Sequence, residues 1–214
     1  HRCCRRQRQM CIRDSIIASI PPSEIGEIAL LLHSDELRDA ASLTWVNYLS
    51  TPAVYGDRSG GVASEFDEPT PTSKRGERRL AAERAWIDTF SDTRVSVQIM
   101  RIAGIYGPGR SVIEQVAAGR ARIIEKEGQV FNRIHVDDIG TSLIASMLRP
   151  NDKRIYNLAD GNPCASGDVT RYACKLLQVE PPTPIKFEDA QLSDMARSFS
   201  VSYTHLRAHE TSHH

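Results

Sequence analysis

The sequence predicts an α/β fold built on a parallel sheet. Short apolar segments typical of strands alternate with segments of helical pattern, and the connections between them are rich in Gly and Pro. Hydrophobic residues make up 40% of the 214 residues and charged residues 25%, which fits one globular domain with a core of its own. No apolar stretch approaches the ~20 residues needed to span a bilayer, so no membrane partner is expected.

Four elements are expected in the first half of the chain. An apolar run at 16–20, stopped by two prolines, predicts a buried strand. Residues 24–39 repeat Ile and Leu loosely at helical spacing, and residues 43–50 are rich in β-branched and aromatic residues, as in a second strand. After a loop rich in turn-forming residues, residues 75–90 favour a helix because they are rich in Ala, Arg and Glu. The core is expected to hold Trp45 and Trp86.

The second half continues the alternation. Residues 95–109 are expected to form a strand that runs into a Gly/Pro loop, and residues 154–160 another short strand. Apolar residues at helical spacing predict helices over 137–148 and 169–177. The side chains expected to cap these two helices are Asp138 for the first and Ser166 or Asp168 for the second.

The two ends of the chain differ from the middle. Residues 1–15 hold five Arg and three Cys, residues 200–214 hold four His, and neither end has an apolar period of 2 or 3.6. RRQRQMCIRDS and VSYTHLRAHET are similar to translated sequencing adaptors. Both ends are therefore expected to be non-native tails without packed elements, and 16–199 to be the domain.

Setting the tails aside removes two apparent functions. The middle segment carries 21 Lys and Arg against 25 Asp and Glu, a net charge of −4, so no nucleic-acid partner is expected. The His-rich end is likewise not taken as a metal site. Only Cys164 and Cys174 remain between the tails, and two cysteines do not make a disulfide framework. A reduced, cytoplasmic setting is therefore expected.

Four motifs then carry a family resemblance. LSTPAVYGD (49–57), RIAGIYGPGR (101–110), RIHVDDIG (133–140) and YNLADGNP (156–163) follow one another in the order seen in extended short-chain dehydrogenase/reductases. The sequence resembles that family, which includes the NAD-dependent epimerases and dehydratases, over nearly all of 16–199. The resemblance implies a Rossmann-like parallel sheet with a small C-terminal substrate lobe, and NAD or NADP as the cofactor.

The phosphate-binding turn of that family is missing. The chain contains no GxGxxG, and GIYGPG at 104–109 has the wrong spacing. By the resemblance, about the first third of the domain is absent, so we expect an incomplete sheet and a fragment whose full-length parent binds the cofactor.

The resemblance also implies a catalytic group. Thr51, with Ser50 beside it, matches the family's Ser/Thr, which hydrogen-bonds the substrate oxygen. In RGERRLAAE, Arg75 stands where the family has its catalytic Tyr and Arg79 where it has Lys. A guanidinium stays protonated and is a poor general base, so Arg75 and Arg79 are expected to bind an anion, with Arg79 on the cofactor. The alternative is that the hydroxyls satisfy backbone groups and the arginines belong to a solvated helix face.

Further contacts are expected at the strand ends. An Asn usual in the family is replaced by Gly104, and an Arg by Phe131, which argues against a standard nucleotide-sugar substrate. The alternative for Tyr55 and Tyr106 is packing in the interior, and the alternative for His135 is a structural contact. The cofactor contacts expected are Ser19, Arg79, Ile102, Ala103 and Gly104, and the substrate contacts are Tyr55, Tyr106, Arg133 and His135.

Two functions remain open. The first is an NAD(P)-dependent, epimerase/dehydratase-like oxidoreductase that acts on a small-molecule substrate. The second is a sensor or scaffold that binds NAD(P) without turnover. A homodimer is possible in either case, and no resident metal is expected.

Overall fold

A four-stranded sheet forms the centre of the computed structural model, which describes residues 14–58, 61–151, 154–192 and 205–206. All neighbouring strands are parallel, and their order matches the sequence order of the predicted strands. The predicted α/β fold with a parallel sheet is confirmed. The strands, in spatial order, are β1 (Ser15–Ala18), β2 (Trp45–Ser50), β4 (Ser96–Ile102) and β8 (Arg154–Leu158).

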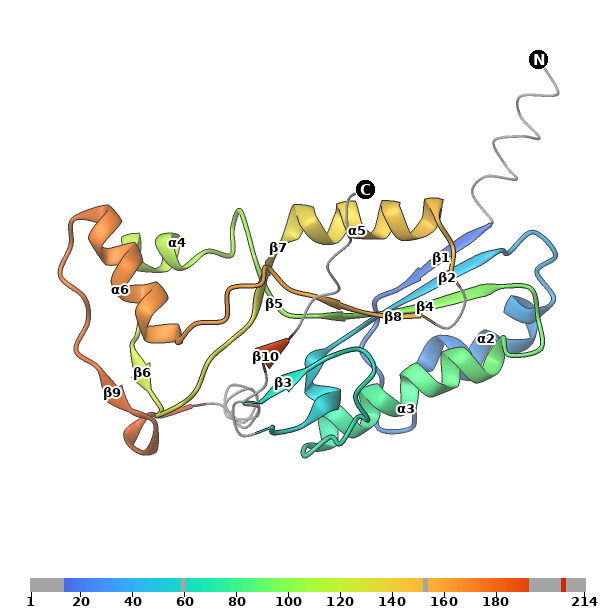
Figure 1. Ribbon diagram of the computed structural model, residues 1–214, viewed down its shortest axis with the longest axis horizontal. Coiled ribbons are helices and arrows are strands. Elements are labelled where there is room, and N and C mark those ends of the chain that lie inside the picture. Colours follow the sequence, from blue (N-terminus) through green and yellow to red (C-terminus); the bar gives the residue numbers. More distant parts are fainter. Residues whose placement is uncertain (1–13, 59–60, 152–153, 193–204, 207–214) are drawn as a thin grey trace, which may run out of the picture.

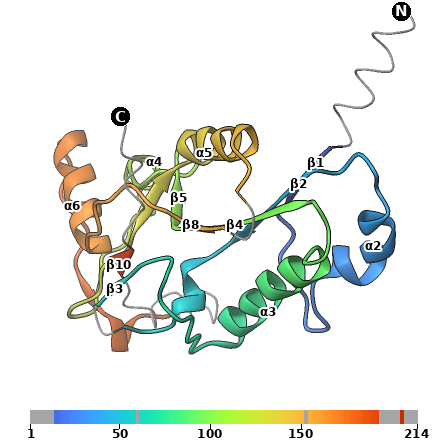
Figure 2. The same ribbon diagram turned by 45° about the vertical axis from the view of Figure 1, so that its right-hand side comes forward.

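Helices cover both faces of this sheet. Figures 1 and 2 show α2 (Ile28–Arg38) and α3 (Lys74–Thr89) on one face and α5 (Val136–Leu148) on the other. This layering follows from the parallel strands, because each right-handed crossover places its helix on a face of the sheet. The predicted helices differ from the observed ones by a few residues at their ends.

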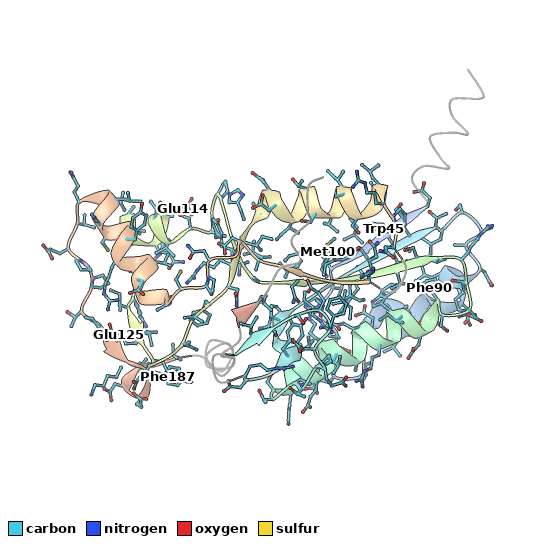
Figure 3. The ribbon with its side chains drawn as sticks, in the orientation of Figure 1. Trp45, Phe90, Met100, Glu114, Glu125 and Phe187 are labelled. Atoms are coloured by element: carbon cyan, nitrogen blue, oxygen red, sulfur yellow. The ribbon has the colours of Figure 1, made fainter. Side chains whose placement is uncertain are left out.

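Both tryptophans lie in the core, as predicted. Trp86 is fully buried and stacks between Tyr48 and Phe90, with ring centroids 6.3 Å from each. Trp45 is buried too, and its indole Nε1 donates to Gln98 Oε1 at 2.9 Å. Figure 3 shows Trp45, Phe90 and Met100 around the sheet and its helices.

A smaller lobe stands beside the sheet. It combines segments from two parts of the chain, so it is not purely C-terminal as expected. Glu114 forms the capping box of its first helix, and Arg171 pairs with Glu125 and Asp168. Figure 3 shows Glu114, Glu125 and Phe187 in this region. Its elements are α4 (Val112–Ala117), β6 (Ile124–Glu125), α6 (Ser166–Leu177), β9 (Ile185–Lys186) and the 3₁₀ turn η2 (Phe187–Asp189).

Short elements that the sequence pattern did not predict gather near the carboxyl ends of the strands. With two or three residues each, most of these strands are too short to show a period of 2. One of them lies in the segment expected to be a tail, where Leu206 is buried; the remainder of 200–214 and residues 1–13 lie outside the described residues. The elements are η1 (Pro52–Tyr55), β3 (Val62–Ala63), β5 (Gly104–Tyr106), β7 (Arg133–His135) and β10 (His205–Leu206).

The helix caps differ from the prediction. The His135 ring, not Asp138, caps α5, since His135 Nδ1 accepts from the backbone N–H of Asp137 at 3.3 Å. Ala165 precedes α6 without any side-chain cap, and the predicted Ser166 is already the first helical residue. Both corrections arise because the helices begin earlier than the apolar pattern suggests.

Within the described ranges, no helix is long and apolar enough to cross a membrane. The same part of the chain contains no group of three His, Cys, Asp or Glu residues placed to hold a metal ion.

Candidate active site

The carboxyl ends of β1, β2 and β4 meet at one edge of the sheet. Parallel α/β sheets bind ligands outside this edge. Ser19, just after β1, is exposed, and Thr51, just after β2, is half-buried. After β4 the chain is anchored, because Ala103 is buried and donates its N–H to the carbonyl of Leu158 at 3.0 Å. Ile102 is buried, whereas Gly104 is exposed.

The two predicted hydroxyls have different partners. Thr51 Oγ1 accepts from the N–H of Ala53 at 3.4 Å and so caps η1. Ser50 is buried and its hydroxyl donates to Glu83 Oε1. Thr51 is therefore the hydroxyl that stands at the open edge, and Ser50 belongs to the interior.

A glycine sets the distance between α3 and the end of β2. A Cβ built at Gly76 would lie 2.6 Å from the carbonyl oxygen of Ala53 and 3.0 Å from Pro71 Cβ. Only glycine lets the first turn of α3 approach η1 this closely. Ser73 caps the helix by accepting from the N–H of Gly76 at 3.1 Å. Arg75 and Arg79 are thereby held near Thr51.

The side chain of Arg79 turns back toward β2. Its Nη1 donates to Tyr48 Oη at 3.0 Å and to the carbonyl of Leu49 at 2.9 Å, and its guanidinium carbon lies 5.7 Å from the Tyr48 ring centroid. Burial raises the pKa of Tyr48 to about 12, although Arg79 opposes the shift. Tyr48 therefore stays protonated at neutral pH and acts as a support for Arg79.

Arg75 lies one turn before Arg79 on the same helix and is more exposed. Burial of part of its side chain lowers its pKa, and the positive charge of Arg79 lowers it further. Like charges four residues apart on a helix repel each other, so an anion placed between them would be favoured.

A buried ion pair supports the edge from below. Arg101 on β4 donates from Nε to Glu83 Oε1 at 3.1 Å and from Nη2 to Glu83 Oε2 at 2.6 Å; Arg101 is 1% exposed and Glu83 2%. Burial lowers the pKa of Arg101, but the hydrogen bonds and charge of Glu83 outweigh it, so the net shift is upward. This pair joins α3 to the central strand.

Tyr55 extends the same network. It is fully buried, with the Arg101 guanidinium 4.6 Å from its ring centroid, and its hydroxyl donates to Asn157 Oδ1 at 2.9 Å. Burial raises the pKa of Tyr55. The structure thus places Tyr55 beneath the edge, where packing is its visible contribution; its predicted contact with substrate stays a prediction.

Three other predicted substrate residues form a separate group on β5 and β7. The rings of Tyr106 and His135 meet edge to face at 5.3 Å between centroids. Arg133 Nη1 donates to the carbonyls of Phe131 at 3.1 Å and Cys164 at 3.3 Å, and lies 3.3 Å from Cys164 Sγ. The ladder between β5 and β7 holds this group together.

Proteins of similar sequence and structure are known for this fold. A functionally unknown conserved protein from Silicibacter pomeroyi superposes with a TM-score of 0.86 at 39% identity, covering 91% of this chain and 68% of that one. The chain belongs to the family of this protein. Protein YeeZ from Escherichia coli K12 is 29% identical over 175 residues, which are 79% of this chain and 61% of YeeZ. The chain thus spans about three fifths of this curated relative's length.

Solved structures that share this fold include a dehydratase and an epimerase in complex with NAD. A dTDP-glucose 4,6-dehydratase from Bacillus anthracis in complex with NAD superposes with a TM-score of 0.72 at 15% identity, covering 91% of this chain and 64% of that one. A dTDP-L-rhamnose 4-epimerase from Burkholderia thailandensis is 26% identical over 156 residues, 65% of this chain and 42% of its own. No protein-family model matches the chain. The predicted resemblance is confirmed at the level of the fold.

The family resemblance did not reveal three buried charged residues, Glu27, Glu83 and Arg101. Glu83 and Arg101 lie within the sequence motifs, but the resemblance implies no role for either. The available signal was Arg101 itself, a single charge in the apolar strand SVQIMRI, since a charge in a central strand is rarely buried without a partner. Glu27 gave no sequence signal, because it lies among loop residues near the start of a helix.

Burial of Glu27 makes the stability of the fold depend on pH. It is 4% exposed; its Oε1 accepts from the N–H of Ala29 at 3.4 Å, and its Oε2 has no hydrogen-bond partner among the described residues. Burial raises its pKa, against the opposing effects of that hydrogen bond and of Arg79. The folded state therefore favours the protonated form of Glu27. The stability that this protonation adds to the fold is complete below pH 4.5, the ordinary pKa, and is lost as the pH rises through the higher pKa of the folded state.

We therefore expect Glu27→Gln to gain stability relative to wild type as the pH rises from 4 to 7. Urea unfolding at several pH values measures the difference. Glu180→Gln, at an exposed position, is the control and should show no such trend. Parallel pH profiles for wild type and Glu27→Gln would contradict the expectation.

Proposed function

We propose that the protein from which this chain comes is an NAD(P)-dependent, epimerase/dehydratase-like oxidoreductase acting on a small-molecule substrate. The observation that carries the proposal is the placement of Arg79 and Thr51 at the carboxyl edge of a parallel sheet, fixed by the contact of Gly76 with Ala53. The solved dehydratase with the same fold holds NAD. The cofactor supplies hydride transfer when it is bound.

The residues present fit one side of such a cofactor. Arg79 uses Nη1 for Tyr48 and Leu49, and in the described part of the chain its Nε–H and Nη2–H₂ remain as donors for a ribose or phosphate oxygen. Arg75 adds a second positive charge. Thr51 Oγ1, as an acceptor and donor at the open edge, is placed to orient a substrate oxygen. The proposed walls of the cofactor site are Ser19, Ile102, Ala103 and Gly104.

The second candidate is a sensor or scaffold that binds NAD(P) without turnover. The observation in its favour is that an arginine stands where the family's acid/base tyrosine is expected, while Tyr48 and Tyr55, on neighbouring elements, are fully buried. Dinucleotide binding without any change of NAD(P)H absorbance across carbonyl substrates would select this alternative.

The substitution Arg79→Ala tests NAD(P) binding, the step that both candidate functions share. The measurement is NADH and NADPH affinity of the full product of the gene, by fluorescence titration. Loss of one or two charge-assisted hydrogen bonds is expected to weaken binding about 10- to 100-fold. Arg84→Ala, at an exposed position of the same helix, is the matched control. Equal affinity of wild type and Arg79→Ala would remove Arg79 from the site.

We also propose a homodimer through the outer faces of α2 and α3. These faces form an open groove of about 560 Å³ whose lining includes Ala81, Ala85 and Leu31, the last of which is 56% exposed. Arg78 and Asp88 lie at opposite ends of the groove on α3. A two-fold axis pairs a surface with itself in reverse, so this groove, in which Arg78 already pairs with Glu24 at 2.9 Å, would meet the same groove of the partner.

Leu31→Asp is expected to convert the dimer into a monomer, measured by light scattering during size-exclusion chromatography. The added charge would be buried at the interface without a partner. Leu148→Asp, which changes an exposed leucine on the opposite face of the sheet, should leave the mass unchanged. A wild-type monomer at tens of micromolar would contradict this proposal without affecting the cofactor site.

We place the protein in a reducing, cytoplasmic setting. Cys164 and Cys174 are both free thiols, and a reducing compartment keeps thiols in that state.

A further inference from the structure

A buried carboxyl group lies at the start of α2, beside α3. Figures 1 and 2 both show these two helices next to each other on one face of the sheet. Glu27 is the N-cap residue of α2, is only 4% exposed, and lines the groove between the helices. Glutamate is rarely buried so completely without a partner, so its surroundings have to account for its presence there.

Hydrogen bonds satisfy only one oxygen of this carboxyl group. Its Oε1 accepts from the N–H of Ala29 at 3.4 Å and so caps α2. Its Oε2 has no hydrogen-bond partner among the described residues. One long hydrogen bond does little to offset the cost of burying a charge, so the ionised form of Glu27 depends on a positive charge nearby.

Charged and titratable groups reach Glu27 from α3 and β2. On α3, the positive charge of Arg79 lowers the pKa of Glu27, against the larger effect of burial. On β2, the charge of Glu27 helps to raise the pKa of Tyr48, the residue that binds Arg79. Arg78 and Glu24 line the same groove but pair with each other at 2.9 Å. Within the described residues, Arg79 is thus the counter-charge of Glu27.

The same guanidinium group is the one proposed to bind the cofactor. Arg79 commits Nη1 to the Tyr48 hydroxyl and the Leu49 carbonyl, and its other donors are those proposed for a ribose or phosphate oxygen. An anion held by these donors and the carboxylate of Glu27 would both draw on one positive charge. Charges that interact over a few ångströms in a partly buried site influence each other strongly.

We propose that Glu27 is a positioning residue that acts through Arg79, and that its carboxylate takes up one proton from the solvent when Arg79 binds the anionic cofactor. This inference rests on the proposed cofactor site. A second anion beside Arg79 disfavours the ionised form of Glu27, because like charges disfavour each other and Arg79 is already neutralised. By linkage, protonation of Glu27 strengthens anion binding by the same factor.

The direction of the pH dependence follows from the burial of Glu27. Burial raises its pKa above the ordinary 4.5, so cofactor affinity is highest at low pH and falls as the pH rises through that raised pKa. The affinity levels off again once the carboxyl group is ionised in the complex as well. Glu27→Gln keeps an oxygen that can accept from the N–H of Ala29 and stays neutral at every pH, so it should retain the high affinity.

The test measures NADH affinity of the full product of the gene by fluorescence titration between pH 5 and pH 8. NADH is the probe because its phosphate groups do not titrate in this range. Wild-type affinity is expected to fall about 3- to 10-fold over the range. Glu27→Gln should vary by less than about twofold and bind at pH 8 as tightly as wild type does at pH 5. Asp35→Asn, which removes an exposed charge from the same helix, is the matched control and should follow wild type.

Two further measurements show whether Glu27 acts by taking up a proton and through Arg79. Calorimetry in buffers of different ionisation enthalpy should find more proton uptake on NADH binding by wild type than by Glu27→Gln. In an Arg79→Ala background, Glu27→Gln should change the affinity by less than about twofold, because the residue through which it acts is gone.

The outcomes separate this inference from the proposed function. Parallel pH profiles for wild type and Glu27→Gln, equal proton uptake, or an undiminished effect of Glu27→Gln without Arg79 would overturn the role of Glu27 and leave the cofactor site in place. A wild-type protein that binds no NADH at any pH would overturn the proposed function and this inference together.

Discussion

Replacing Glu83 with alanine is expected to lower the free energy of unfolding by about 3–5 kcal/mol. Both carboxylate oxygens accept from Arg101, and the pair is almost completely excluded from solvent. Without Glu83, the Arg101 charge stays buried with no counter-charge, its Nη1 already lacks a hydrogen-bond partner among the described residues, and Ser50 loses its acceptor. Equilibrium urea unfolding measures the change.

Two further variants separate the ion pair from general damage to the helix. Glu77→Ala changes an exposed glutamate on the same helix and should alter stability by less than about 0.5 kcal/mol. The double variant Glu83→Leu/Arg101→Met should recover much of the loss, because removing both charges avoids an unpaired one. A Glu83→Ala loss no larger than that of Glu77→Ala would show that the buried pair does not stabilise the fold.

The sequence predicts the layers of the fold because the main elements carry a clear pattern. The strands at 45–50 and 96–102 are apolar runs, the helix at 74–89 is rich in helix-favouring Ala, Arg and Glu, and the helix at 166–177 has a periodic apolar face. The two- and three-residue strands at the carboxyl edge carry no such pattern. They form because the ends of β4 and β8 and the loop after η1 are already close, so tertiary contacts decide them.

The site was predictable in part for a similar reason. Motif order places Thr51, Arg79 and the end of β4 at one edge, since the carboxyl ends of parallel strands coincide. The partner of each side chain depends on contacts between distant segments. Arg79 binds Tyr48 from β2, and Glu83 binds Arg101 from β4. Neither pairing follows from spacing within a helix, where RGERRLAAE suggests only local ion pairs.

The positions of Arg75 and Arg79 depend on the contact between α3 and η1. Gly76 lies between them in sequence and touches the backbone of Ala53, two residues after Thr51. The backbone positions of Arg75, Arg79 and Thr51 are thereby fixed relative to one another. Such an arrangement suits the binding of an anionic cofactor more than proton transfer, because a guanidinium group is a poor general base.

The contact itself gives the second large prediction. Gly76→Ala is expected to destabilise the protein by about 1–3 kcal/mol, since the new Cβ would lie 2.6 Å from the Ala53 oxygen and 3.0 Å from Pro71 Cβ. A carbonyl and a proline ring cannot swing aside, so the first turn of α3 must move. Arg75 and Arg79 move with it, and NADH affinity of the full gene product should fall together with stability.

Gly140→Ala is the matched control, because Gly140 is also helical but a Cβ at that position would meet no described atom within 4 Å. There the substitution should stabilise the protein by about 1 kcal/mol, the usual preference for alanine over glycine inside a helix. The same chemical change is thus expected to act with opposite signs at the two positions. If both variants were stabilised, α3 would not be held against η1, and the positions of Arg75 and Arg79 relative to Thr51 would lose their physical basis.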